Sequence, residues 1–222
     1  MSPRAEREWR KMAGIIHEPM TREGSCRGII FRLYPYSDTS LIFHVLSEEL
    51  GLISLIAKGA RRLNSSFAGK LDLFYFCRFE FIPSRKSDLH TLKEVQLLDA
   101  HSNLTRNYEL LCDVSANARA LERLIERGIP VPELFSLFSD YLKYLPAHVE
   151  PRLGNILFRI RLLALLGNAP KFDRMRLSEE RMEMILNLLK KDWAELLTLA
   201  PGKEDLHFLE YVAEAHLKDC SR

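Results

Sequence analysis

The sequence lacks any apolar run of about 18 residues, the length that a membrane-spanning helix requires. The segment from Met1 to about Glu23 is charged throughout and lacks the apolar centre of a secretory signal peptide. Cysteine is sparse as well, and no C-x-x-C pair occurs among Cys26, Cys77, Cys112 and Cys220. We therefore expect no membrane partner, a cytoplasmic location and reduced cysteines.

The motifs of common enzyme classes are also absent. The sequence has no G-x-S-x-G elbow, P-loop, dinucleotide fingerprint or H-E-x-x-H motif. The seven histidines are scattered, and His44 and His90, which fall on expected strands, are typical of structural or surface histidines. We predict that the chain is not an enzyme and that it needs no cofactor.

Charge is nearly balanced over the whole chain but not within it. The formal net charge is +2, from 32 Lys and Arg against 30 Asp and Glu. Residues 58–86 hold seven basic residues and only two acidic ones. A polyanionic partner would therefore have to meet a local patch rather than the molecule as a whole.

The first hundred residues have the pattern of a β-sheet protein. Strands are predicted at 26–33, 40–46, 52–57, 71–82 and 89–98, and the second and third read as a hairpin. Arg27 and Arg32 are an odd number of positions apart, which predicts that they lie on opposite faces of the first strand. In the fourth strand the odd positions are apolar throughout, which predicts one face buried along its whole length.

After residue 100 the periodicity changes from 2 to about 3.6, which predicts helices at 102–127, 133–145, 152–166, 178–191 and 203–217. Five short strands before them favour a small closed barrel of OB type, because closure removes exposed sheet edges. The predicted fold class is therefore α+β with two domains. A loosely ordered extension at 1–24 precedes the barrel at 25–101 and an all-helical domain at 102–222.

The segment that joins the third and fourth strands concentrates the positive charge. It carries Lys58, Arg61, Arg62 and Lys70, and Gly59 and Gly69 lie close to its two ends. A glycine-bounded basic loop fixed to a sheet suits the binding of a phosphate backbone, although a solvated surface loop has the same composition. Phe67, within the loop, is the main candidate for stacking on a base, with one even-position ring of the fourth strand as a further candidate.

Several motifs occur in the order and spacing of the bacterial recombination and repair mediator family RecO, which the chain resembles. They are GIIFR at 28–32, YSDTSLI at 36–42, ELGLI at 49–53, AKGARR at 57–62 followed by SSFAGKL at 65–71, and LKE at 92–94. The resemblance is strong over 26–99, and AKGARR is its most specific part. It continues weakly through PELF at 132–135 and FRIRLLALLGNAP at 158–170.

The resemblance implies an OB fold, a helical second domain and a role in recombination. Members bind single- and double-stranded DNA, anneal complementary strands and help to load recombinase. They work with RecR and with the C-terminal tail of single-stranded-DNA-binding protein. The resemblance therefore implies these partners here, and a location at the nucleoid during repair.

Nine basic residues of the predicted barrel are candidates for binding phosphate: Arg27, Arg32, Lys58, Arg61, Arg62, Lys70, Arg78, Arg85 and Lys86.

Two other interpretations of the chain stay open. The barrel could instead dock a protein while its basic loop meets an acidic peptide, which would make the chain an interaction adaptor with no direct DNA role. A dispersed enzyme site at the domain junction has the least support.

The chain departs from the family at one place. Many members carry a four-cysteine zinc site just after the segment that ends here at Pro170, but residues 172–176 read FDRMR and the next cysteine is Cys220. One cysteine with His207 and His216 cannot supply four ligands. We expect no metal site.

Elemental analysis of the purified chain should therefore find zinc far below one ion per chain. Zinc that remains stoichiometric after dialysis against a weak chelator would contradict the prediction.

Overall fold

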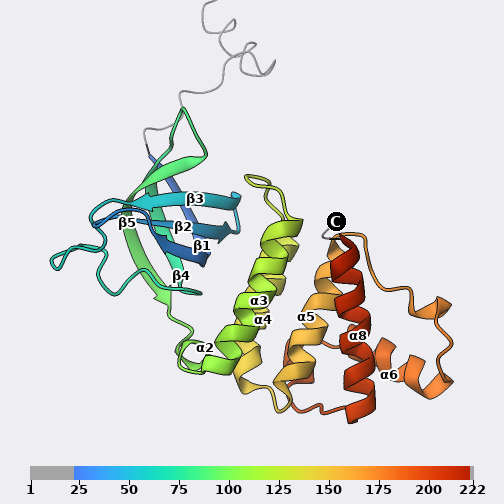
Figure 1. The fold of residues 1–222 in the computed structure, drawn as a ribbon. Coiled ribbons are helices and arrows are strands. Elements are labelled where there is room, and N and C mark those ends of the chain that lie inside the picture. The colour runs from blue at the N-terminus through green and yellow to red at the C-terminus, as the bar shows by residue number, and fades with distance from the viewer. Residues whose placement is uncertain (1–22, 221–222) are drawn as a thin grey trace, which may run out of the picture.

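The computed structural model describes residues 23–220 as a five-stranded barrel followed by a helical region (Figure 1). The fold class predicted from the sequence is confirmed. The extension predicted at 1–24 lies almost wholly outside the described residues, and Gly24 already belongs to the first strand. No helix in the described range is both long and apolar enough to span a membrane.

The barrel strands are β1 (Gly24–Pro35), β2 (Leu41–Ser47), β3 (Gly51–Ala57), β4 (Phe76–Ile82) and β5 (Leu89–Asp99). They close in the order β1-β2-β3-β5-β4, and every neighbouring pair is antiparallel except β3 with β5. The predicted hairpin is confirmed as β2 and β3.

The fourth strand is shorter than the alternation of its residues predicts. Residues 71–75 lie outside the strand, with a turn at Leu73 and Phe74, because Phe74 takes a left-handed φ of 63° that a strand cannot accommodate. The N–H of Phe74 donates to the carbonyl of Ile30, and its ring is buried. From Cys77 onward the predicted alternation holds, with Phe79 inside the barrel and Arg78 outside.

The prediction that Arg27 and Arg32 lie on opposite faces of β1 is wrong. The pairing of β1 with β2 shifts register between Ile30 and Arg32, which marks a β-bulge. The extra residue turns both Phe31 and Arg32 toward the helices, on the outer side of the barrel that Arg27 also occupies.

The helical region contains α2 (Ser102–Thr105), α3 (Tyr108–Leu124), α4 (Pro132–Tyr144), α5 (Pro151–Leu165), α6 (Glu179–Lys190), α7 (Trp193–Leu196) and α8 (Lys203–Cys220). Short 3₁₀ turns lie at Leu145–Ala147 and Phe172–Arg174. The single helix predicted at 102–127 is wrong, because Asn107 interrupts it and caps α3 through the N–H of Leu110. Pro132 occupies the first position of α4, and the hydroxyl of Ser178 caps α6 by accepting the N–H of Arg181.

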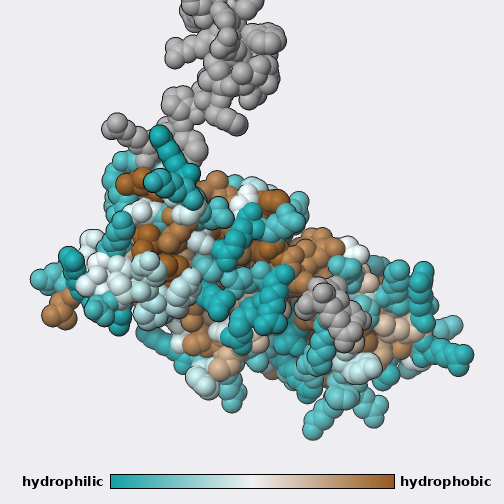
Figure 2. All heavy atoms as spheres, turned by 45° about the horizontal axis from the view of Figure 1, so that its top comes forward, coloured by the Kyte–Doolittle hydropathy of each residue, from teal (hydrophilic) through white to brown (hydrophobic). Residues whose placement is uncertain are grey.

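One apolar core joins the barrel to the helices. It contains Ile29 and Phe31 from β1 together with Phe138 from α4. The Phe31 and Phe138 ring centroids are 5.4 Å apart. Apolar atoms also reach the surface between the barrel and the helices (Figure 2). The connection from α3 to α4 exposes Ile129 and Val131. The two halves therefore pack as one body.

A polar cluster around Glu122 of α3 completes the junction. Its carboxylate accepts from Arg32 at 3.1 Å and from His44 Nδ1 at 2.7 Å, and Arg127 lies 3.6 Å away. The hydroxyl of Tyr34 lies 3.4 Å from the other ring nitrogen of His44. A neutral imidazole protonated on Nδ1 satisfies both contacts. Burial lowers the pKa of His44 below its usual 6.5, and this effect outweighs the hydrogen bond with Glu122, which acts to raise the pKa.

This junction should weaken in acid. Because His44 binds a proton less readily in the folded chain, its contribution to the free energy of unfolding is complete above about pH 6.5 and is lost as the pH falls toward the folded pKa. Urea unfolding at about pH 7.5 and about pH 5.5 should show lower stability in acid, and a smaller loss in His44→Asn. Burial also lowers the pKa values of His90 and His148. Both residues are present in both proteins, so they contribute equally to the two losses of stability. Equal losses in the two proteins would contradict this role.

Candidate nucleic-acid interface

The segment after β3, residues 58–70, is a succession of hydrogen-bonded turns, and we call it the basic loop. The N–H of Arg62 donates to the carbonyl of Gly59 at 3.1 Å, that of Ser65 to Arg62 at 3.1 Å and that of Ala68 to Ser65 at 3.2 Å. Gly59 has a φ of 75°, which glycine adopts without the steric cost of a side chain. The loop therefore has a defined shape.

Phe67 anchors the basic loop in the barrel. Its side chain is only 9% exposed and belongs to the core that includes Ile30 and Phe79. The expectation that Phe67 stacks on a base is therefore wrong, because the barrel core buries the ring. The even-position rings of the predicted fourth strand are not free to stack on a base either. Phe74 is buried, and Phe76 packs against Phe135 with ring centroids 6.2 Å apart.

Arg61 fixes the basic loop to the turn between β1 and β2. Its backbone N–H donates to the carbonyl of Thr39 at 3.0 Å, and its Nη1 donates to the carbonyl of Ser37 at 2.8 Å. The same turn carries Tyr36, which is 64% exposed. Sequence reasoning missed this ring, because nothing in the composition of the segment between the first two predicted strands distinguishes an exposed tyrosine from a buried one.

The basic loop presents four exposed cations: Lys58, Arg61, Arg62 and Lys70. Among the described side chains, residues 23–218, no carboxylate lies within ion-pair distance of any of them. Their charge is therefore available to an anion from solvent. Figure 1 shows the loop in teal on the side of the barrel away from the helices.

The other predicted residues lie elsewhere. Arg27 pairs with Glu48 at 2.7 Å, and Arg32 is held by Glu122. Arg78 is exposed on the outer face of β4, opposite Arg27 in the pairing of β1 with β4.

Arg85 and Lys86 lie in the turn between β4 and β5, which is distant from the basic loop. That turn precedes Leu89, which pairs with Ser54 in the middle of β3, whereas the basic loop follows the end of β3. The turn projects separately in Figure 1. The structure therefore brings four of the nine predicted residues together in one loop.

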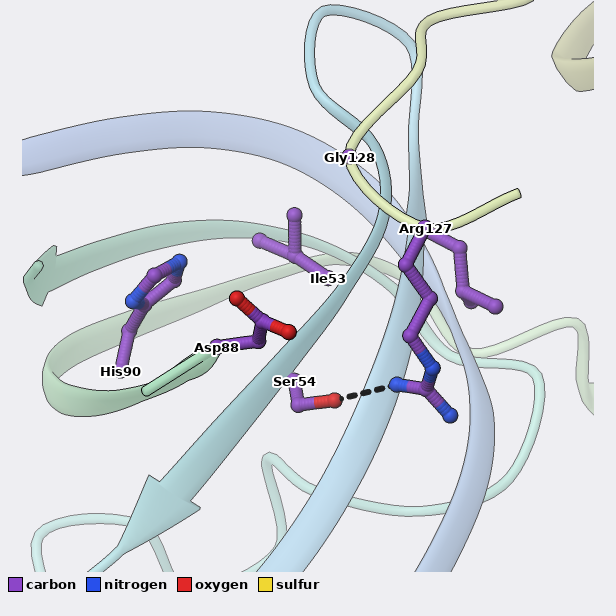
Figure 3. A pocket seen from close by; sticks show the side chains of 7 residues that line it. Ile53, Ser54, Asp88, His90, Arg127 and Gly128 are labelled. Carbon is purple, nitrogen blue, oxygen red and sulfur yellow. Dashed lines mark hydrogen bonds between the residues drawn. The ribbon is translucent and has the colours of Figure 1, made fainter. Parts of the chain in front are cut away.

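The junction also forms a pocket of about 120 Å³ between β3, the start of β5 and the connection from α3 to α4 (Figure 3). Arg127 Nη1 donates to Ser54 Oγ at 2.6 Å, so the hydroxyl is bonded to a permanent cation instead of a base. His90 Nδ1 accepts the N–H of Ser84 at 3.1 Å. This geometry contains no pair of nucleophile and base. The lining residues are Leu52, Ile53, Ser54, Asp88, His90, Arg127 and Gly128.

The described side chains, residues 23–218, contain no group of three or more His, Cys, Asp or Glu that could hold a metal ion. Burial raises the pKa of the Cys26 and Cys77 thiols to about 12, which keeps both in the unreactive thiol form.

Comparison with known proteins gives a consistent assignment. Two family models match: "Recombination protein O N terminal" over residues 20–101 and "Recombination protein O C terminal" over residues 108–183. Proteins named "DNA repair protein RecO" are 27% identical over 161 residues in Thermodesulfovibrio yellowstonii, 34% over 146 in Rhodopirellula baltica and 24% over 155 in Listeria monocytogenes. The alignments cover 70%, 66% and 70% of this chain.

The same alignments span 64%, 54% and 60% of the lengths of those three relatives, so the chain matches only part of each. The first match covers the barrel and the second runs from α3 into the first turn of α6, so segments of both halves of the fold match one family. This chain therefore belongs to the recombination protein O (RecO) family.

Proposed function

We propose that the chain is a non-enzymatic, DNA-binding protein of repair and recombination. It binds single- and double-stranded DNA through the basic loop, promotes annealing of complementary strands and helps to load recombinase. The observation that carries the proposal is the set of four exposed cations on one ordered loop, without carboxylate partners among the side chains of residues 23–218. The family of the chain and the names of its relatives support the same role.

Binding works by neutralising phosphate charge. Lysine and arginine side chains that contact a DNA backbone release its condensed counterions, which favours association whatever the base sequence. Annealing then requires only that two strands come close with reduced repulsion, since base pairing supplies the free energy. No step calls for nucleotide hydrolysis or a bound cofactor.

Tyr36 supplies the base-stacking surface in this proposal. Its exposed ring lies on the turn to which Arg61 donates, so that an aromatic face and the cations occupy one end of the barrel. Stacking on a tyrosine is tolerant of base identity and suits a protein that handles any sequence.

The partners in the proposal are RecR and the tail of single-stranded-DNA-binding protein. The helices meet the barrel away from the basic loop (Figure 1), so a protein bound to them leaves the loop accessible to DNA. A DNA-binding measurement at low salt separates this proposal from the adaptor alternative, because an adaptor shows no DNA binding even under that condition.

Removing two loop cations should weaken DNA binding. Lys58→Gln with Arg62→Gln should lower the affinity for a single strand by about tenfold, because two phosphate contacts are lost. Both side chains are exposed and have no ion pair within the described residues, so folding should be unaffected. Fluorescence anisotropy with two oligonucleotides of different sequence should show an equal loss for both.

The matched control is Arg85→Gln with Lys86→Gln, which removes the same charge from the distant turn. This pair should lose much less affinity than the loop pair. Equal losses in the two double variants would show that total charge, and not the basic loop, determines binding.

The salt dependence should report the number of contacts. Four phosphate contacts predict a slope of log affinity against log salt of about −3 for single strands. Removing Lys58 and Arg62 should halve that slope. A flat salt dependence of the unchanged chain would contradict the electrostatic mechanism.

A further inference from the structure

Leu63 is the most exposed large apolar side chain in the described part of the molecule. Its exposure is 101%, whereas the other exposed large hydrophobics range from 37% to 79% and so retain contact with the protein. Solvent surrounds the side chain, which therefore adds nothing to the packing of the fold. It lies in the basic loop between Arg62 and Asn64.

The loop holds Leu63 outward. The carbonyl of Arg62 accepts the N–H of Ser65 at 3.1 Å, so Leu63 is the second residue of a tight turn at the tip. On one side Arg61 bonds to the turn between β1 and β2, and on the other Phe67 is buried in the barrel. Because both sides are fixed, the leucine cannot fold back onto the barrel without breaking these contacts.

The surroundings of Leu63 favour DNA as its contact. Arg61, Arg62 and Asn64 beside it are polar and exposed, and no apolar neighbour in the loop extends it into a protein-docking patch. A gap between two stacked bases accepts a single aliphatic side chain, while flanking cations reach the phosphates on either side.

We propose that Leu63 is an apolar wedge that enters between adjacent bases of the DNA held by the basic loop. This inference rests on the proposed DNA binding and adds a structural effect to it: local unstacking of the bound DNA. Steps that unstack easily, such as TA, would be the favoured points of entry.

The test uses a duplex with 2-aminopurine at a central TA step, whose fluorescence rises when the base unstacks. The unchanged chain should raise the fluorescence at saturating protein. Leu63→Ser should reduce the rise by about fivefold, since the apolar contact is lost. Because all four cations remain, the slope of log affinity against log salt for a single strand should stay at about −3 in this variant.

Two further variants make the result specific. Leu63→Met keeps an apolar side chain of similar size and should restore the fluorescence rise. Leu186→Ser, which removes an exposed leucine from α6, should behave like the unchanged chain.

The outcomes separate the two proposals. An equal fluorescence rise with Leu63→Ser and with the unchanged chain would overturn the wedge while leaving DNA binding intact. Binding of single strands and duplex without any fluorescence rise would do the same. Failure of the unchanged chain to bind either DNA at low salt would overturn both proposals.

Discussion

The burial of Phe67 is the constraint on which the shape of the basic loop depends. An aromatic side chain moved from water into the barrel core contributes about 2 kcal/mol, and that contact interrupts a polar segment of the chain. Because Phe67 is fixed inside, the residues before it must leave the end of β3 and return to the barrel. The cations and Leu63 lie on that excursion, so one core contact orders a loop whose polar residues have no core of their own.

The architecture of the barrel was predictable because its inner side chains alternate, and the deviations arise where the outer face is buried as well. In β1, Ile29, Ile30 and Phe31 are all buried, the first and last against the helices. A run that is apolar on both faces contains no signal for the bulge. The left-handed Phe74 is equally invisible, since its ring is buried from a turn rather than from a strand.

The candidate site was predictable in composition but not in extent. Residues 58–86 form one basic stretch in sequence, yet the chain crosses the whole barrel in β4 between Lys70 and Arg85. Linear proximity therefore overstated the patch. The sequence also does not reveal which carboxylates pair with the outlying cations. Glu122 is 90 residues from Arg32, and only the packing of α3 on the barrel brings the two side chains together.

The Glu122 cluster also shapes the distribution of charge over the barrel. Its carboxylate is 12% exposed and faces Arg32 and Arg127, so these cations contribute less positive potential on the helix side than their number suggests. Glu48 and Glu49 have the same effect on Arg27. At the contact between α3 and the barrel, Glu122 compensates the charge of Arg32 and Arg127, whereas no described carboxylate does so at the basic loop. The carboxylate of Glu122 thus stabilises the contact between the two halves, and the uncompensated positive charge of the barrel lies on the opposite side, in the basic loop.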